Sequence, residues 1–250
     1  MKMLPKSVAV AVATLVLPFF SFAGEMEELR SAVEKSDWGS GKSIGEALTA
    51  TETENGEAFY LLGKSLVGLK ENEAAVVALK RANELVSGNA DYLADYGYAL
   101  IMRGQEMNMF QAGPTFLRAM DQYKAAVEVN PDHMGAHIGL ARYYMNAPAI
   151  GGGSMVKAKE HAAEVARINP FRGHIESAEI AKKENRFADV EAEYAAAIAL
   201  DPKQGWVHFE LAKQQQASGK MMEAKASYEK ALELNPEHQG AKKALEAFGG

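Results

Sequence analysis

The sequence lacks cysteine and has few aromatic residues. None of its 250 residues is Cys, and Phe, Trp and Tyr together account for 8%. Without Cys there are no disulfides even in an oxidising compartment, so the stability of the fold comes from packing alone. The low aromatic content, with Ala, Glu, Lys and Leu prominent, favours helices over sheets, because strands are enriched in aromatic and β-branched residues.

The N-terminus carries an apolar run that is too short to span a membrane. The run, residues 8–20, has about 13 residues, whereas a spanning helix needs about 20. Lys2 and Lys6 precede it, and residues 21–23 (Ser-Phe-Ala) place small side chains where a signal peptidase reads the chain. We therefore predict that residues 1–23 are a cleaved signal peptide of bacterial type, with an uncleaved anchor as the alternative. The mature chain is then periplasmic or secreted, without a transmembrane segment.

The charge of the chain argues against one class of partner. The formal net charge is −6, and it becomes about −8 once residues 1–23 are removed, because that segment holds Lys2, Lys6 and no acid. Neutralising nucleic-acid phosphates requires a basic face. We therefore predict no nucleic-acid partner, although the balance leaves room for a locally basic groove.

Proline residues punctuate the second half of the chain at regular intervals. Four pairs carry them: Asn130-Pro131, Asn169-Pro170, Asp201-Pro202 and Asn235-Pro236. Proline lacks an amide donor and disfavours helix in the residue before it, so each pair ends a helix. The prolines are 39, 32 and 34 residues apart, and punctuation near 34 residues indicates a helical repeat.

The unit from Gly205 to Glu237 shows the repeat most clearly. It predicts a first helix over residues 206–218, a turn at Gly219-Lys220 and a second helix over residues 221–234. Small residues recur where two antiparallel helices approach closely, and an aromatic fills the wider gap beside them. The small residues are Ala212, Ala224 and Ala231, and the aromatic is Tyr228; Leu211 and Pro236 fill two further positions of the pattern. In this spacing the unit resembles the tetratricopeptide repeat, with Ala212 in place of the usual Gly.

The same spacing recurs over residues 56–248, where about five units fit it. Residues 240–248 predict the solvating cap helix that such stacks need at their end. The resemblance implies an all-α fold, a right-handed α-solenoid of about five helix-turn-helix units with a C-terminal cap helix, over residues 56–250. Residues 24–55 predict N-terminal helices that could form a degenerate first repeat.

Two units carry extra residues between their paired helices. About ten fall in residues 104–116, which include Gly113 and Pro114, and about five fall in residues 147–154, which include Pro148. Both insertions stand at the turn between paired helices, so we expect both on the same edge of the stack. This edge is a second candidate contact surface, with tolerated surface insertion as the alternative.

The partner of a tetratricopeptide-repeat protein usually lies along the first helices, which line the concave face. The resemblance therefore implies that the chain is an interaction scaffold for another protein or peptide. With about 100° of rotation per residue, the packing positions fix which side chains face the concavity. The candidates are Tyr60, Lys64, Tyr98, Met102, Ile138, Arg142, Met145, Ile175, Lys182, Trp206, Phe209 and Lys213.

Apolar anchors alternate with basic groups in this set. Lys64, Arg142 and Lys213 occupy the same position in three different repeats. That composition suits an apolar ligand segment flanked by acidic groups or by a free carboxylate.

A metal or small-ligand carrier is the alternative function. His133 and His137 are four residues apart and could share a helix face, and methionines are dense around the first insertion, at Met102, Met107, Met109 and Met120. A His pair without a third ligand is weak support, and Met is also a common contact residue at protein-binding surfaces. We therefore predict no metal site.

No catalytic grouping is recognisable in the sequence. Gly41-Lys42-Ser43 lacks the earlier Gly and the preceding strand of a phosphate loop. We predict neither enzymatic activity nor a cofactor.

Overall fold

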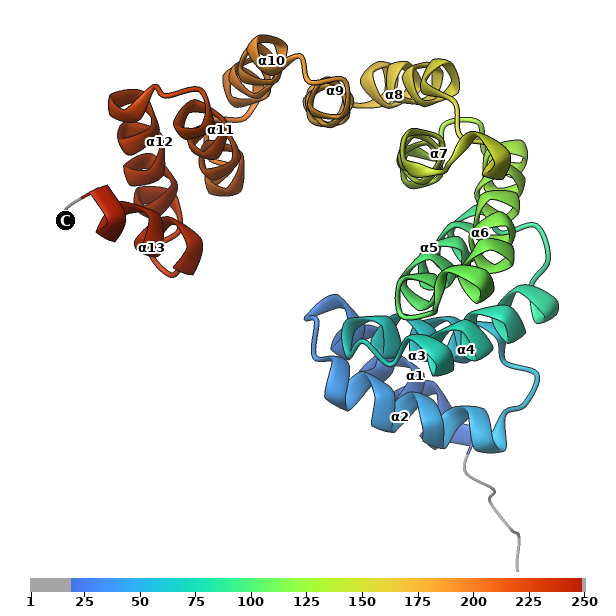
Figure 1. Cartoon of the computed structure of the whole chain (residues 1–250). Coiled ribbons are helices and arrows are strands. Elements are labelled where there is room, and N and C mark those ends of the chain that lie inside the picture. The colour runs from blue at the N-terminus through green and yellow to red at the C-terminus, as the bar shows by residue number, and fades with distance from the viewer. Residues whose placement is uncertain (1–18, 249–250) are drawn as a thin grey trace, which may run out of the picture.

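The structure is a computed structural model that describes residues 19–248. Residues 1–18, the larger part of the predicted signal peptide, lie outside the described residues. Residues 19–248 form thirteen α-helices and one short 3-10 turn, and they contain no strand (Figure 1). The helices are α1 (Phe19–Glu34), α2 (Trp38–Thr51), α3 (Gly56–Gly68), α4 (Asn72–Leu85), α5 (Ala90–Gln105), α6 (Met109–Val129), α7 (Met134–Asn146), α8 (Met155–Ile168), α9 (Pro170–Lys183), α10 (Phe187–Leu200), α11 (Gly205–Ala217), α12 (Met221–Leu234) and α13 (Gln239–Phe248), with the 3-10 turn η1 at Ala149–Gly151.

Many helices begin at a residue whose side chain accepts a hydrogen bond from the first turn. Such a side chain satisfies backbone N–H groups that the helix itself leaves unpaired. The capping residues are Asp37, Asn55, Asn89, Asn108, His133, Ser154 and Asn169.

Asn169 has a double role, because it ends α8 and also caps α9. Pro170 is therefore the first residue of α9, where a missing N–H costs no helical hydrogen bond. In the next repeat α11 begins three residues after Pro202. The direct junction at Asn169 explains why the prolines at 170 and 202 stand closer together than the usual repeat length.

Paired helices approach closely because small residues line their contacts. Second helices bury an Ala or Val with no exposed surface at Ala75, Ala119, Ala158, Val190 and Ala224; this residue lies in the first turn except in the extended α6. On the facing helix, a Cβ added at Gly63 would lie 2.5 Å from Cγ of Leu79, so only glycine fits that approach. One turn further along the second helices, buried tyrosines fill the wider gap at Tyr123, Tyr194 and Tyr228.

The helix pairs follow one another in an open arc, with α7 and α11 on its inner side and α8 and α10 on its outer side (Figure 1). The cap helix α13 packs against the last pair, where Ala241 is fully buried beside Tyr228. No helix within residues 19–248 is both long and apolar enough to cross a membrane.

An additional pair, α1 and α2, precedes the five repeats recognised in the sequence. Met26 and Leu29 of α1 and Leu48 of α2 form a buried cluster with Ala58 and Leu61 of α3. The stack of residues 19–248 therefore contains six helix pairs. Residues 19–23, predicted as the end of the signal peptide, form the start of α1.

The first insertion is helical, whereas the sequence suggested extra turn residues. Helix α5 has 16 residues and α6 has 21, against 13 or 14 in the other repeats, and only three residues connect them. Asn108 caps the extended α6, and Pro114 stands in its second turn. Proline deprives the carbonyl of Phe110 of its helical partner, and both residues are exposed, so water can serve that carbonyl.

The second insertion is a compact loop that packs back onto α7. Gly152 adopts a left-handed conformation with φ 86°, which favours glycine. The Tyr143 hydroxyl donates to the carbonyl of Gly151 at 2.7 Å, and the amide of Ser154 donates to the carbonyl of Tyr144. These bonds hold the loop against the C-terminal end of α7.

Candidate functional site

A pocket whose surface is mainly apolar opens between α5, α6 and α7; we call it the apolar pocket. Its volume is about 660 Å³, which lies within the usual range for ligand sites. Helix α5 contributes six residues of one face, among them Tyr98, Ile101, Met102 and Gln105, and α7 contributes residues that include Gly135, Ile138, Gly139 and Arg142. Residues three or four apart lie on the same side of a helix, so the two first helices form the opposing walls.

Both insertions close the end of the apolar pocket that lies toward the turns. Gly113, Phe116 and Leu117 of the extended α6 line it, as do Pro148 and Gly151 of the loop after α7. The two surfaces that the sequence offered as rivals, the concave face and the insertion edge, therefore meet in one pocket.

Tyr123 of α6 brings a hydrogen-bonding group into the apolar pocket. Its ring lies beside Gly139, where an added Cβ would come within 2.5 Å of Cζ. Only 4% of the residue is exposed, yet its hydroxyl makes no hydrogen bond within residues 19–248. Burial, together with the charge of nearby Asp95, raises the pKa of Tyr123 well above its ordinary value. The hydroxyl is thus a neutral donor that has no acceptor in the described part of the chain.

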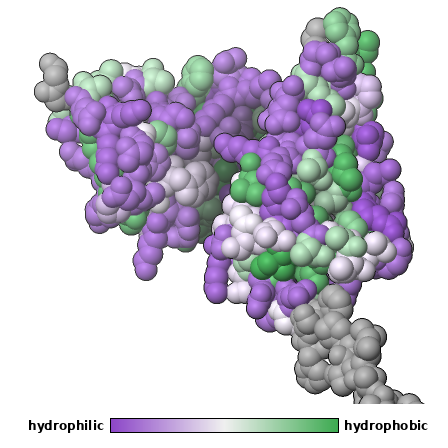
Figure 2. Space-filling view, turned by 90° about the horizontal axis from the view of Figure 1, so that it is seen from below, coloured by the Kyte–Doolittle hydropathy of each residue, from purple (hydrophilic) through white to green (hydrophobic). Residues whose placement is uncertain are grey.

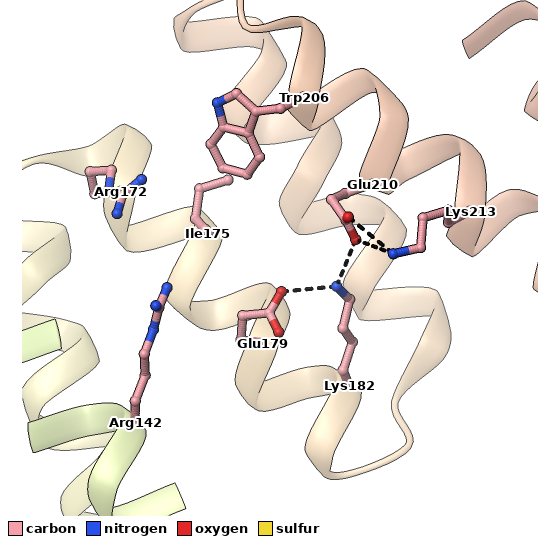
Figure 3. A pocket seen from close by; sticks show the side chains of 8 residues that line it. All are labelled: Arg142, Arg172, Ile175, Glu179, Lys182, Trp206, Glu210 and Lys213. Atoms are coloured by element: carbon pink, nitrogen blue, oxygen red, sulfur yellow. Dashed lines mark hydrogen bonds and ion pairs between the residues drawn. The ribbon is translucent and has the colours of Figure 1, made fainter. Parts of the chain in front are cut away.

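A second pocket adjoins the first at Arg142, which lines both; we call it the charged pocket. Its volume is about 590 Å³, and α7, α9 and α11 supply its walls. Figure 3 shows its eight side chains. They are Arg142, Arg172, Ile175, Glu179, Lys182, Trp206, Glu210 and Lys213.

Ion pairs link neighbouring first helices across the charged pocket. The guanidinium of Arg142 donates to both carboxylate oxygens of Glu176, at 2.8 and 3.0 Å, and Glu176 is only 2% exposed. Lys182 binds Glu179 at 2.9 Å and Glu210 at 3.4 Å, and Lys213 binds Glu210 at 3.0 Å (Figure 3). Burial opposes the ionisation of Glu179, but Lys182, the Tyr194 hydroxyl and the charge of Arg142 together outweigh it and hold the pKa of Glu179 below its ordinary value.

Arg172 differs from the other cations of the charged pocket. Arg142, Lys182 and Lys213 each have a carboxylate partner. The Arg172 side chain forms no hydrogen bond or ion pair within the part of the chain that the structure describes, and in Figure 3 it lies on the same side of the pocket as Arg142. The charged pocket therefore contains one guanidinium that is available to an anion.

Comparison with known proteins agrees with this architecture. Residues 207–238 match the family profile of the tetratricopeptide repeat. A thermophilic TPR protein of Thermus thermophilus is 21% identical with a TM-score of 0.62, over 77% of this chain and 97% of that one. The chain has the tetratricopeptide-repeat fold. The expected right-handed α-solenoid with a cap helix is confirmed.

Two further solved structures share this TPR fold at lower identity. PilW, described as a widely conserved type IV pilus biogenesis factor, is 13% identical with a TM-score of 0.67, over 90% of this chain and 98% of that one. A tetratricopeptide repeat protein of Parabacteroides merdae is 14% identical with a TM-score of 0.57, over 92% of this chain and all of that one. No curated protein sequence matches the chain significantly.

The TPR stack brings most of the predicted groove residues to the two pockets. The apolar pocket contains Tyr98, Met102, Ile138 and Arg142, and the charged pocket contains Arg142, Ile175, Lys182, Trp206 and Lys213. The remaining four predicted residues, which line neither pocket, are Tyr60, Lys64, Met145 and Phe209.

These four residues have partners of their own. The Tyr60 hydroxyl donates to Asp95 at 2.7 Å, and the ammonium of Lys64 lies 3.7 Å from the same carboxylate. Met145 packs against the buried core of α5 to α8, and Phe209 packs against Tyr228 and the cap helix. Their contacts are within the fold.

The histidines of the alternative carrier function are already engaged. His133 caps α7 through Nδ1 and contacts Asp91 through Nε2, at 3.0 Å. Nε2 of His137 donates to the carbonyl of Pro131, and its Nδ1 lies 3.0 Å from Nδ1 of His161. Within residues 19–248 no three His, Asp or Glu side chains gather as a metal site requires.

Sequence reasoning missed the acidic half of the groove and the free cation. Asp95, Glu176 and Glu210 lie one repeat beyond Lys64, Arg142 and Lys182, the cations that they pair with. A search for opposite charges about one repeat apart on first helices was the available signal. Nothing in the sequence distinguishes Arg172 from the other cations. It differs from them only in that its side chain has no carboxylate partner within residues 19–248.

Proposed function

We propose that the chain is an exported scaffold that binds a segment of another protein in the groove formed by the apolar and charged pockets. The observation that carries the proposal is the junction of the two pockets at Arg142, which makes one binding surface from α5 to α11. Export rests on the predicted signal peptide, residues 1–23. Met26, Leu29 and Val33 of α1, which pack in the core of the first pair, all follow the predicted cleavage site.

We infer a binding role without catalysis. Within residues 19–248 the cations of the charged pocket other than Arg172 are held in ion pairs, of which Arg142–Glu176 and Lys182–Glu210 bridge neighbouring first helices. An arrangement of this kind stabilises a surface and selects a partner by its charge pattern. A resemblance to PilW, a pilus biogenesis factor, also fits a scaffold that serves assembly in the cell envelope.

Site-specific photo-crosslinking in living cells tests the proposal. A photoreactive amino acid at Met102 or Ile138 lies in the apolar pocket, while the same residue at Val77 of α4 is 65% exposed and outside both pockets. We expect both groove positions to yield an adduct with one shared protein and Val77 to yield none. Adducts from Val77 alone would place the partner on another face. The mass of the purified native chain tests export, with Gly24 expected as the first residue.

A further inference from the structure

We propose that the segment in the groove carries large apolar side chains followed by a carboxylate, and that Arg172 binds this carboxylate. The inference rests on the proposed groove function and adds the chemistry and the order of the partner segment. Two groups without a partner in residues 19–248 support it: the hydroxyl of Tyr123 in the apolar pocket and the guanidinium of Arg172 in the charged pocket.

The apolar pocket determines the first part of the segment. Tyr98, Met102 and Ile138 face a space of about 660 Å³ whose surface is mostly carbon. Gly135 of α7 is exposed and carries no side chain, so a ligand can approach the backbone there, whereas the ring of Tyr123 packs over Gly139. Burial of large apolar side chains there is the main favourable contribution. The Tyr123 hydroxyl can donate to a backbone carbonyl of the same segment.

The charged pocket determines the second part. Arg142, Lys182 and Lys213 are neutralised by carboxylates of the chain itself, so a further anion gains little from them. Arg172 forms no ion pair within residues 19–248, and Trp206 and Ile175 line the same pocket (Figure 3). A guanidinium binds a carboxylate through two parallel hydrogen bonds. Charge complementarity therefore favours an acidic group at this point.

The spacing between the two parts follows from the helix packing. Neighbouring packed helices lie about 8–10 Å apart, and Arg172 on α9 is one to two such steps from the centre of the apolar pocket. An extended chain covers about 3.3 Å per residue. The carboxylate is thus expected about three to six residues from the apolar side chains, either as Asp or Glu or as a free C-terminus.

Selection from a library of displayed random 12-residue peptides tests the inference with the purified native protein. We expect the enriched peptides to share large apolar residues and, about three to six residues away, an acidic residue. Synthetic peptides with free and amidated C-termini, and with Asp or Glu changed to Asn or Gln, separate a side-chain carboxylate from a terminal one. Removal of the correct carboxylate should weaken binding at least about tenfold, as measured by fluorescence anisotropy.

Two variants with matched controls assign the parts of the segment to their pockets. Gly113→Leu fills the apolar pocket from α6, where an added Cβ meets no atom within 4 Å, while Gly39→Leu makes the same change on exposed α2. Arg172→Glu reverses the charge in the groove, and Lys225→Glu does so on α12, outside both pockets. We expect each groove variant to bind at least about tenfold more weakly and each control to bind normally. A lysine in place of the acidic peptide residue should restore binding to Arg172→Glu.

The outcomes distinguish this inference from the groove function. If Gly113→Leu blocks the peptides but neither Arg172→Glu nor loss of the carboxylate changes their affinity, the groove stands and the acidic specificity is wrong. If no peptide is enriched, or if Gly113→Leu leaves binding intact, the groove function itself is wrong. Circular dichroism of each variant verifies that the helices are retained.

Discussion

The two parts of the groove use one scaffold for different surfaces. In the pairs α5/α6 and α7/α8 the inner face is apolar, and residues of both insertions line the apolar pocket. In the pairs α9/α10 and α11/α12 the helices keep the regular length of 13 or 14 residues, and carboxylates and ammonium groups cover the inner face. Figure 2 shows, on the face seen from below, hydrophilic side chains over most of the C-terminal part and hydrophobic patches on the part near the N-terminus.

The difference shows which features the packing dictates and which it leaves free. Tyr123 and Tyr194 occupy the same buried position of their second helices. The Tyr194 hydroxyl donates to Glu179 at 2.9 Å and accepts from Lys182, while the Tyr123 hydroxyl has no partner within residues 19–248. Packing thus fixes the ring, and the residues of the inner face decide whether its hydroxyl serves the fold or a ligand.

The largest contrast is expected from adding a methyl group to two helical glycines. At Gly173 of α9 the added Cβ would lie 2.3 Å from Cα of Ala166, so the backbone must shift. Gly173→Ala should lower the free energy of unfolding by about 3 kcal/mol. Gly113→Ala meets no atom beyond its chain neighbours, and because Pro114 opposes the gain in helix propensity, it should change the free energy of unfolding by less than about 0.5 kcal/mol. Urea unfolding measures both, and equal effects would contradict a crowded α8–α9 contact beside an open pocket.

The hydroxyls of the two tyrosines provide the next contrast. Tyr194→Phe removes hydrogen bonds to two charged groups and should cost about 1–2 kcal/mol of stability. Tyr123→Phe removes no bond within the described chain and should change stability by less than about 0.5 kcal/mol. Thermal and urea unfolding of the two variants check the difference. A similar loss in both would show that the Tyr123 hydroxyl has a partner in the unliganded protein.

Acidification should affect the two regions at different pH values. Burial, and then the neighbouring His137, lower the pKa of His161 in α8, so the folded chain holds it neutral. Below about pH 6.5 the unfolded chain binds this proton first, and the stability of the α7/α8 pair falls. The lowered pKa of Glu179 gives stability to the α9 region that is lost only below about pH 4.3.

Hydrogen exchange, corrected for the intrinsic rate at each pH, reports this order region by region. Protection should fall in α7 and α8 between about pH 7 and 5.5, on either side of the ordinary histidine pKa, while α9 to α12 remain protected. His161→Gln should remove the early loss. Simultaneous loss in both regions would mean that His161 does not control the first one.

The smallest effect is expected from an exposed member of the ion-pair set. The side chain of Lys213 is 52% exposed and pairs with Glu210 three residues before it. Lys213→Ala should change the free energy of unfolding by less than about 0.5 kcal/mol, because exposed pairs gain little and salt screens them. A loss above about 1 kcal/mol in urea unfolding would show that the pairs act as one cooperative network.

The sequence predicted the repeat because its signals are local. Proline pairs mark helix ends, and small residues and tyrosines recur at fixed distances from them. The same phase placed Tyr98, Met102, Ile138 and Arg142 on the face that lines the apolar pocket. These assignments need only the helical period and the packing of one repeat.

Two features depend on information that one repeat does not contain. Glycine and proline at 113 and 114 suggested a turn, but the cap at Asn108 starts a helix early enough for Pro114 to stand in its second turn. Lys64, Arg142 and Lys182 each pair with a carboxylate of the next repeat, as with Arg142 and Glu176. Only the stack reveals which charges neutralise each other.

The open arc also has a mechanical consequence. Each helix pair packs mainly against the pair before it and the pair after it, so the curvature is a sum of small rotations that no distant contact fixes. A segment that fills both pockets would contact four consecutive pairs, from α5 to α12, on the inner side of the arc. Its contacts would then oppose straightening of the arc. Forces that straighten the arc would move Arg172 away from the apolar pocket and release the segment. The spring constant of the solenoid would then set the residence time of its partner.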